Sequence, residues 1–353
     1  MRLFICEKPS QARDIARVLQ ASRRGDGCLK GQNLTVTWCV GHLLETAPPE
    51  TYGDYKRWSL DDLPIIPSRW QLVAKPKVAG QLKVISQLLR TCSEVVIATD
   101  ADREGEMIAR EILERCQYQG PILRLWLSAL DETSIRRALG ALRPGEQTLP
   151  LYHCALARSR ADWLVGINLS RLFTLLGRRA GFDGLLPVGR VQTPTLRLVV
   201  KRDRAIASFV PQPFWTVDAH LEQDGIRFHA RWQPTAAVSD AVGRCIDETA
   251  AQQALRRLTQ AGSAQIDSVE VERVREGPPL PFDLGTLQEI CSAKLGLGAQ
   301  ETLATAQALY ETHKATTYPR TDCGYLPESM LDEVPRVLHA LAAAAPSLGA
   351  VLK

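Results

Sequence analysis

The segment from residue 95 to residue 104 constrains the possible fold more than any other part of the sequence. Residues 95–99, Val-Val-Ile-Ala-Thr, are a short apolar run rich in β-branched side chains, which predicts a buried strand of a parallel sheet. The carboxylates of Asp100, Asp102 and Glu104 follow directly. Open α/β sheets bind ligands at the carboxyl ends of their strands, and hard oxygen ligands this close together suit Mg²⁺. The alternative is a charged first turn of the next helix, because acids also favour that position.

Strands and helices alternate over the first 150 residues. Four apolar runs predict strands, at residues 3–6, 34–40, 95–99 and 122–127. Helical spacing of apolar residues predicts four helices, at residues 12–19, 78–89, 106–116 and 135–142. Ser10 is the expected N-cap of the first helix. This alternation predicts a mostly parallel sheet sandwiched between helices.

The remainder of the chain has a different pattern, so the sequence predicts a multidomain protein of the α/β and α+β classes. We expect three further segments: a helical one at residues 151–212, a β-rich one at 213–276 and a helical one at 277–353. Within the second, period-two alternation on both sides of Asp224-Gly225 predicts a hairpin. The same alternation returns at residues 266–274 and predicts another strand.

Composition limits the classes of protein to which the chain can belong. The formal net charge of +4 is too small to argue for nucleic-acid binding, so local arginine clusters must carry that argument. Nine cysteines without a Cys-x-x-Cys pair argue for reduced thiols and against a structural zinc site. The sequence contains no run of about 18 apolar residues and starts without a signal-peptide pattern. We therefore expect a cytoplasmic protein that does not enter a membrane and acts as a monomer.

Glu7 and Lys8 end the first predicted strand just as Asp100 and Asp102 follow another. Because parallel strands open on the same edge of a sheet, one site can hold these four residues together with Glu104. The alternative for Glu7 and Lys8 is an ordinary solvated surface pair.

Tyr318-Pro319-Arg320 is a second group of residues with chemical potential. A tyrosine hydroxyl is a poor nucleophile until a base or a nearby cation favours its anion. Arg320 lies two residues after Tyr318, and its planar guanidinium can hold a phosphate. Pro319 stiffens the backbone between them. The alternative is a core tyrosine beside a surface arginine.

Taken together, these motifs resemble those of the type IA DNA topoisomerases, and most of all the bacterial topoisomerase III branch. The resemblance rests on Glu-Lys-Pro-Ser at residues 7–10, Asp-x-Asp-x-Glu-Gly at 100–105 and Tyr-Pro-Arg-Thr-Asp at 318–322. Further stretches carry it along the whole chain: MRLFI at 1–5, GHLLE at 41–45, RW at 57–58, ARSRADW at 157–163, VGRVQTP at 188–194 and YETHK at 310–314.

The resemblance implies a fold and a chemistry. Residues 1–150 are similar to a Toprim domain, which is Rossmann-like, and the later segments to the helical and β parts of the gate. Glu7, Asp100 and Asp102 are implied as Mg²⁺ ligands, and Glu104 as an accessory acid. The remaining implied catalytic residues have one role each: Lys8 contacts the scissile phosphate, Tyr318 forms a 5′-phosphotyrosine link to single-stranded DNA, and Arg320 steadies that phosphate. Religation reverses the step, so no ATP is required.

A second set of residues is expected to follow the DNA strand. It comprises Trp58, Arg158, Arg160, Val188, Gly189, Arg190, Val191 and Gln192. Trp58 could stack on a base, although core packing is the alternative for both Trp58 and Trp163. Asp162 is expected to orient a neighbouring arginine rather than to contact DNA.

Members of the family continue well past the tyrosine and add a histidine motif near the scissile phosphate. This chain ends at Lys353, and His339 does not match that histidine. We therefore expect an incomplete gate and an incomplete tyrosine-bearing domain. Two other functions stay open. One is a Toprim nuclease or primase-like enzyme, in which Tyr318 and Arg320 would have no role. The other is an inactive fragment that only binds single-stranded DNA.

Overall fold

The computed structural model of the chain describes residues 1–326, 328–345 and 347. The chain forms two compact units. The first consists of residues 1–192 together with residues 279–353, and the second of residues 193–278. Within the described residues, no helix is long and apolar enough to cross a membrane.

A seven-stranded sheet lies at the centre of the first unit as far as it is described, in the order β2-β3-β4-β1-β7-β8-β9. Its strands are β1 (Arg2–Cys6), β2 (Arg23–Gly25), β3 (Cys28–Lys30), β4 (Leu34–Trp38), β7 (Glu94–Ala98), β8 (Ile122–Arg124) and β9 (Arg143–Pro144). The four inner strands β4, β1, β7 and β8 are parallel, and the outer strands pair antiparallel. Both β1 and β7 therefore end on the same edge, as the sequence predicts. A separate two-stranded ladder joins β5 (Leu44–Thr46) and β6 (Leu72–Ala74).

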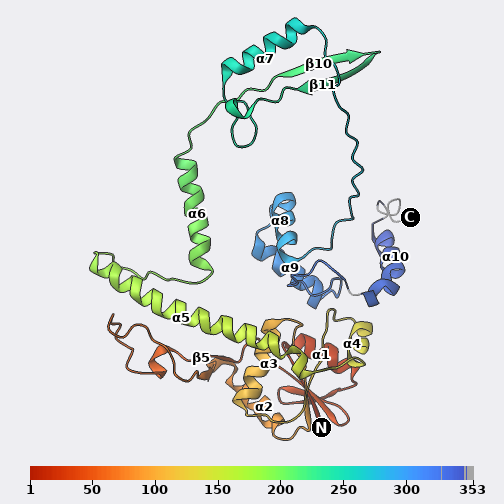
Figure 1. The fold of residues 1–353 in the computed structure, drawn as a ribbon. Helices are drawn as coiled ribbons and strands as arrows, with labels where there is room; N and C mark the ends of the chain where they lie inside the picture. The colour runs from red at the N-terminus through yellow and green to blue at the C-terminus, as the bar shows by residue number, and fades with distance from the viewer. Residues whose placement is uncertain (327, 346, 348–353) are drawn as a thin grey trace. The chain divides into compact units, whose positions relative to one another are not determined.

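Helices cover both faces of this sheet (Figure 1). They are α1 (Pro9–Val18), α2 (Ala79–Leu89), α3 (Arg103–Arg115) and α4 (Glu132–Leu139). Successive residues of a strand point to opposite faces, so Phe4 packs in one core with α1 and α4, while Ile5 packs in the other with α2 and α3. This is the sandwiched α/β arrangement that the alternating pattern predicts.

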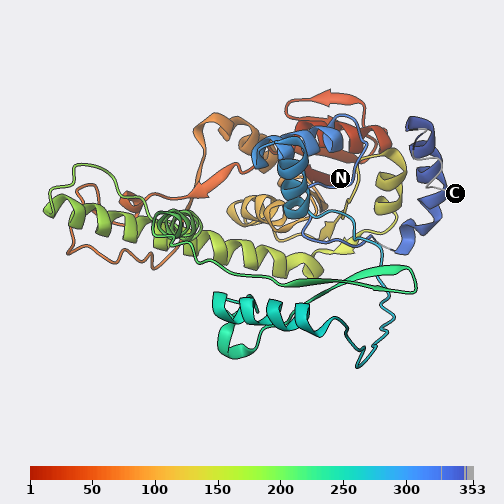
Figure 2. The same cartoon turned by 90° about the horizontal axis from the view of Figure 1, so that it is seen from above.

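The long helix α5 (Leu149–Arg179) packs against α3 and extends beyond the sheet. The proline-rich segment at residues 48–76 runs beside its outer part, as Figure 1 and Figure 2 both show. Side chains of α5 hold that segment: Asn168 Nδ2 donates to the carbonyl of Ile65 at 2.9 Å, and Arg171 Nη1 donates to the carbonyl of Tyr55 at 2.8 Å.

The last part of the chain returns to the first unit. Its helices are α8 (Leu284–Leu295), α9 (Ala299–Glu311) and α10 (Val334–Ala344). Tyr310 and Tyr318 are buried in the same core as Phe4 and α1. The amide of Tyr318 donates to the carbonyl of Ser128 at 2.9 Å, which fixes the tyrosine-bearing segment on the sheet domain.

The second unit contains most of α6 (Gln192–Ala207), the hairpin of β10 (Asp218–Gln223) and β11 (Ile226–Arg231), and α7 (Glu248–Ala261). The hairpin turns at Asp224 and Gly225, both with positive φ (50° and 79°), as the predicted Asp-Gly turn requires. Short 3₁₀ helices occur in both units, at Pro49–Thr51, Pro76–Val78, Gly145–Thr148, Ala236–Val238 and Glu328–Glu333.

Three local predictions are wrong. Ser10 does not cap α1, because Pro9 takes the first helical position and Lys8 is the N-cap residue. Residues 266–274, which the structure describes, form neither helix nor strand, and Val271 stays 86 % exposed. Alternation needs a partner strand to become a ladder. The strand predicted at residues 122–127 ends at Arg124, where the Arg124 side chain bonds the carbonyl of Thr99 that a continuing ladder would use.

Candidate active site

The carboxyl ends of β1 and β7 bring the predicted acidic residues together. The amide of Asp100 donates to Glu7 Oε2 at 3.2 Å. Gln11, on the first turns of α1, links the same two strand ends: its Oε1 accepts from the amide of Glu7 and its Nε2 donates to Asp100 Oδ1, each at 2.9 Å. A buried glutamine thus fixes the relative position of Glu7 and Asp100.

The acidic turn is also the N-terminus of α3, which confirms the alternative interpretation of residues 100–104 as a charged first helical turn. Asp102 is the N-cap residue, and its Oδ1 accepts from the amide of Gly105 at 2.7 Å. Gly105 has no room for a side chain, because a Cβ there would lie 2.2 Å from the carbonyl oxygen of Asp100. The turn is therefore tight, and it directs the second carboxylate oxygen of Asp102 toward the tyrosine.

Negative charge at this site is only partly compensated. Burial, and after it the charge of Asp100, raises the pKa of Glu7 to about 8. Burial also raises the pKa of Asp100, against the effect of Lys8. The Lys8 ammonium lies 3.8 Å from Glu7 Oε1 and 3.7 Å from Asp100 Oδ2, and makes a shorter 2.7 Å contact with Glu311 Oε1. The Lys8 ammonium is thus shared by the carboxylates of Glu7, Asp100 and Glu311.

This donor set fits a divalent metal in its chemistry, since Mg²⁺ takes one or two carboxylates and fills its shell with water and phosphate oxygens. Among the described residues, no group of three or more His, Cys, Asp or Glu side chains is arranged to hold a metal ion. Both carboxylate oxygens of Asp102 accept hydrogen bonds, one from the amide of Gly105 and one from the hydroxyl of Tyr318.

Tyr318 faces the acidic turn. Its hydroxyl donates to Asp102 Oδ2 at 2.7 Å, and its ring packs edge-on against Tyr310 with 5.6 Å between centroids. Burial, followed by the charges of Asp100 and Asp102, raises the pKa of the Tyr318 hydroxyl far above its usual value. Tyr318 is consequently neutral in this state and acts as a hydrogen-bond donor. Arg320 lies beside it, and its Nη1 is 3.8 Å from Glu104 Oε2.

Two ion pairs join the tyrosine-bearing segment to α1 and the strand end before it. Lys8 pairs with Glu311 at the end of α9, and Lys314 pairs with Asp14 of α1 at 2.5 Å. Glu311 also accepts a hydrogen bond from Gln307. The sequence places Glu311 in the YETHK stretch, but nothing in its spacing indicates this contact across 303 residues.

A pocket of about 990 Å³ opens beside the tyrosine and the acidic turn. Asp102, Glu104 and Arg320 line it on one side, and Arg158 and Asp162 of α5 on another. Its further lining includes His42, Lys75, Trp126 and Asp322. Three residues predicted for catalysis or metal binding, Asp102, Glu104 and Arg320, therefore share one cleft with Arg158, the one predicted strand-binding residue in its lining.

The residues predicted to follow DNA divide into two groups. Asp162 orients arginines as expected, because its Oδ1 accepts from Arg190 Nη1 at 2.9 Å and its Oδ2 lies 3.8 Å from Arg158 Nε. Arg160 instead stacks on Trp70, with 5.3 Å from its guanidinium carbon to the ring centroid.

The second group is held against α5. Arg171 lies over the ring of Trp58 at 5.0 Å, so one neighbour of this indole is already a guanidinium. Val188 is fixed by Ser170, whose Oγ accepts from its amide at 2.9 Å. The side chain of Gln192 lies so close to Gly189 that a Cβ there would be 2.9 Å from its Cγ. Val191 is 62 % exposed. Trp163 is packed, since its Nε1 donates to the carbonyl of Ala47 at 3.1 Å and its ring contacts Tyr52 and Trp70.

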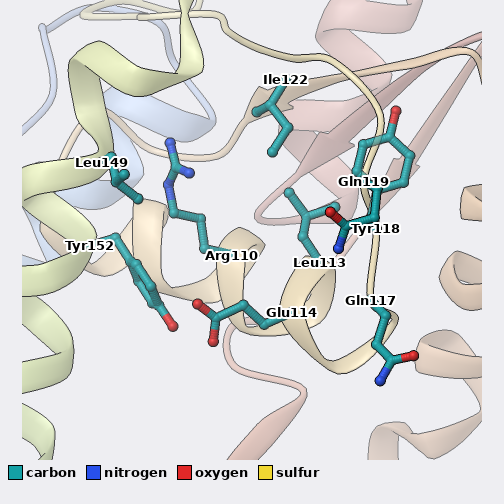
Figure 3. A pocket seen from close by; sticks show the side chains of 9 residues that line it. All are labelled: Arg110, Leu113, Glu114, Gln117, Tyr118, Gln119, Ile122, Leu149 and Tyr152. Carbon is teal, nitrogen blue, oxygen red and sulfur yellow. The ribbon is translucent and has the colours of Figure 1, made fainter.

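A second pocket, of about 520 Å³, lies along the C-terminal half of α3 (Figure 3). Arg110, Glu114 and Tyr152 line it together with Leu113, Gln117, Tyr118, Gln119, Ile122 and Leu149. None of the residues that the sequence singles out for catalysis or DNA binding is among them.

The fold and the site define a class of protein. Residues 2–130 match the Toprim domain family, and residues 146–351 match the DNA topoisomerase family. The chain belongs to the DNA topoisomerase family, and its predicted relationship to the type IA enzymes is confirmed. The Toprim family is associated with divalent metal binding.

Individual relatives give the same result. The chain is 45% identical to DNA topoisomerase 3 of Salmonella typhimurium over 359 residues, which cover 99% of this chain and 55% of that protein. It is 43% identical to DNA topoisomerase 3 of Haemophilus influenzae, over 97% of this chain and 55% of that protein. Full-length topoisomerase I from Thermotoga maritima has a similar structure, with a TM-score of 0.59 and 26% identity over 96% of this chain and 52% of that one. The chain spans about half the length of the curated relatives it matches.

Proposed function

We propose that this chain carries the cleavage and religation chemistry of a type IA DNA topoisomerase. The observation that carries the proposal is the hydrogen bond from the Tyr318 hydroxyl to Asp102 at 2.7 Å, inside a cleft that also contains Arg320. The substrate is single-stranded DNA, and the outcome is relaxation or decatenation without ATP. In a Toprim nuclease or primase-like enzyme, this buried tyrosine would have no chemical role.

Each catalytic side chain has a defined task in the proposed step. The Tyr318 oxygen forms a bond to a backbone phosphorus while the bond from phosphorus to the 3′-oxygen breaks. The hydroxyl proton passes to Asp102 Oδ2, the atom that accepts its hydrogen bond. The Lys8 ammonium gives a proton to the leaving 3′-oxygen, and Arg320 holds the phosphate through its planar donors. Religation runs these transfers in reverse, so the phosphodiester energy is retained.

Glu7, Asp100 and Asp102 would hold the proposed Mg²⁺, with Glu104 as an accessory acid. When bound, this ion would supply positive charge that stabilises the phosphate as its negative charge shifts. These acids lie at the carboxyl edge of the sheet, and the scissile phosphate would bind at the same edge. The crowding of these acids supports the assignment, because a bound cation would relieve the repulsion from Asp100 that contributes to the raised pKa of Glu7.

Arg158, which lines the cleft, and the arginines near it would follow the DNA backbone. Arg158 and Arg190 are oriented by Asp162, and Arg160, Val188, Gly189, Val191 and Gln192 extend the proposed path. Trp58 is the proposed stacking residue. The segments 1–150, 151–212, 213–276 and 277–353 are the proposed Toprim, strand-binding, gate and tyrosine-bearing parts. We propose that the protein acts as a monomer on nucleoid or plasmid DNA in the bacterial cytoplasm.

A covalent-trapping experiment tests the proposal. The protein is incubated with Mg²⁺ and a 3′-labelled single-stranded oligonucleotide, alone and with the remaining C-terminal portion of the Salmonella relative, and the products are separated on a denaturing gel. Label should migrate with the protein, because the tyrosine retains the fragment that carries the new 5′ end. Tyr318→Phe should bind the oligonucleotide normally and form no adduct. An adduct that persists in Tyr318→Phe contradicts the assignment of the nucleophile.

A further inference from the structure

A buried arginine that the proposed mechanism does not use lies directly beneath the acidic turn. Arg124 is the last residue of β8, and its side chain is fully buried. Its Nη1 donates to the carbonyls of Ile97 at 3.1 Å and Thr99 at 2.8 Å, and its Nη2 donates to the carbonyl of Asp100 at 2.5 Å. One guanidinium thus holds the backbone from the end of β7 to the first acid of the turn.

The charge of this arginine is compensated within the core. Arg124 Nε lies 2.5 Å from Oε1 of Glu106, a fully buried residue on the first turn of α3. The other oxygen of Glu106 accepts from Arg110 Nε at 2.7 Å. Buried ion pairs of this kind add little to stability compared with apolar packing, because both charges lose their hydration. The geometry that Arg124 imposes on the turn is therefore the more informative property.

One contact and one effect of charge connect Arg124 with the cleft. Its guanidinium lies 5.1 Å from the ring centroid of Trp126, which lines the pocket beside Asp102 and Arg320. Burial lowers the pKa of Arg124, and the charges of Glu106, Asp102 and Asp100 oppose that effect. The positive charge of Arg124 thus interacts with the charges of both Asp100 and Asp102.

We infer that Arg124 is a positioning residue for the acidic turn, which fixes the direction of Asp100 and Asp102 and offsets part of their repulsion before a divalent cation binds. The inference rests on the proposed function, because it assigns a divalent cation to those carboxylates. Planarity is essential to the role, since a lysine in this place carries the charge but cannot bond three carbonyls at fixed angles. The same argument explains why the sequence gives no sign of it: Arg124 lies inside a predicted strand, 22 or more residues from the acids.

Arg110 provides a matched control. It shares the partner Glu106 and is nearly as buried, and its Nη2 also donates to a backbone carbonyl, that of Gly145, at 2.6 Å. Arg110 lines the second pocket, on the side of α3 shown in Figure 3, and its side-chain hydrogen bonds within the described residues go to Glu106 and Gly145. A purely structural role would make the two arginines equivalent.

The experiment compares Arg124→Lys with Arg110→Lys in the whole chain. Mg²⁺ affinity is measured by calorimetry without DNA, and single-strand binding is measured in EDTA. Arg124→Lys should weaken Mg²⁺ binding by about ten-fold or more, the usual effect of removing a group that orients a ligand, and Arg110→Lys should change it by less than about two-fold on the same scale. Oligonucleotide binding in EDTA should be unchanged in both.

A double variant covers the case in which Arg124→Lys fails to fold. Glu106→Gln with Arg124→Gln removes both buried charges together, and it should also lose Mg²⁺ affinity. Three results would overturn the inference. They are wild-type Mg²⁺ affinity in either folded Arg124 variant, an equal loss of affinity in Arg110→Lys, and a wild-type protein that binds no Mg²⁺. The adduct assay reports separately on the proposed function. If the wild type forms no adduct but binds Mg²⁺, and Arg124→Lys binds Mg²⁺ more weakly, the positioning role still holds.

Discussion

The raised pKa of Glu7 predicts that the metal-free protein loses stability as the pH rises, and that Glu7→Gln prevents much of that loss. The carboxyl has a pKa of about 8 in the folded protein and an ordinary value of 4.5. Between these values the folded state binds the extra proton, so the free energy of unfolding falls with increasing pH. The stabilising contribution of this proton is complete below pH 4.5 and is lost as the pH passes 8.

The magnitude follows from the two pKa values. A shift of one unit corresponds to about 1.4 kcal/mol, so this group alone should lower the free energy of unfolding by roughly 3 kcal/mol between pH 5 and pH 8. Glutamine keeps the shape of the side chain and removes the charge. Glu7→Gln should therefore be more stable than the wild type at pH 8 and much closer to it at pH 5. Asp100 titrates together with Glu7, so the effect belongs to the pair.

The assay is urea denaturation in EDTA at several values of pH between 5 and 8, with the wild type, Glu7→Gln and Glu146→Gln. Glu146 is exposed, and its variant should follow the wild type at every pH. Adding Mg²⁺ should stabilise the wild type more at pH 8 than at pH 5, because the ionised acids bind the cation. Parallel pH profiles for wild type and Glu7→Gln would refute the reasoning, since Glu7 would then titrate as an exposed acid does.

Three further variants test separate parts of the site. Asp102→Asn should weaken Mg²⁺ binding about ten-fold, measured by calorimetry, because it loses one proposed ligand charge; unchanged affinity would contradict the ligand assignment. Arg190→Ala should weaken binding to all single-stranded sequences alike and lower the salt slope by about one; a loss confined to one sequence would indicate base readout. Glu311→Gln should tighten oligonucleotide binding at low salt several-fold, because it releases Lys8, while Glu301→Gln on the same helix should have no such effect; equal binding in both would show that Lys8 does not meet the phosphate.

Much of the sheet domain could be predicted because its signals are local. The apolar run at residues 95–99 and the acids after it define a strand end in a few residues, and the structure has that strand as β7. The helix predicted at residues 78–89 agrees with α2 (Ala79–Leu89) to within one residue at each end. Residues 266–274 show the limit of this approach, because alternation describes a side-chain pattern and a strand also needs a neighbour.

The contacts that complete the site could not be predicted, because they join distant parts of the chain. Spacing alone does not bring Glu311 to Lys8 or Arg124 to Asp100. Gln11 carries no charge and lies in a helical stretch, so nothing in the sequence distinguishes it from a surface glutamine. Trp126 is similar: the tryptophan expected to stack in the cleft is Trp58, whereas Trp126 lies at the pocket that holds Asp102 and Arg320. Roles of this kind depend on which side chains meet, and the sheet topology decides that.

Three proposed catalytic side chains each face an acid in the structure. Tyr318 donates to Asp102, Lys8 contacts Glu311, and Arg320 faces Glu104. In the proposed function, a DNA phosphate would have to compete with an acid for Lys8 and Arg320, so binding of the strand would be coupled to rearrangement of these pairs. The ion pair of Arg124 and Glu106 is fully buried beneath the acidic turn. The site therefore combines a buried ion pair beneath the acidic turn with more exposed pairs of Tyr318, Lys8 and Arg320. In the proposed function, DNA and Mg²⁺ would replace the partners in these more exposed pairs.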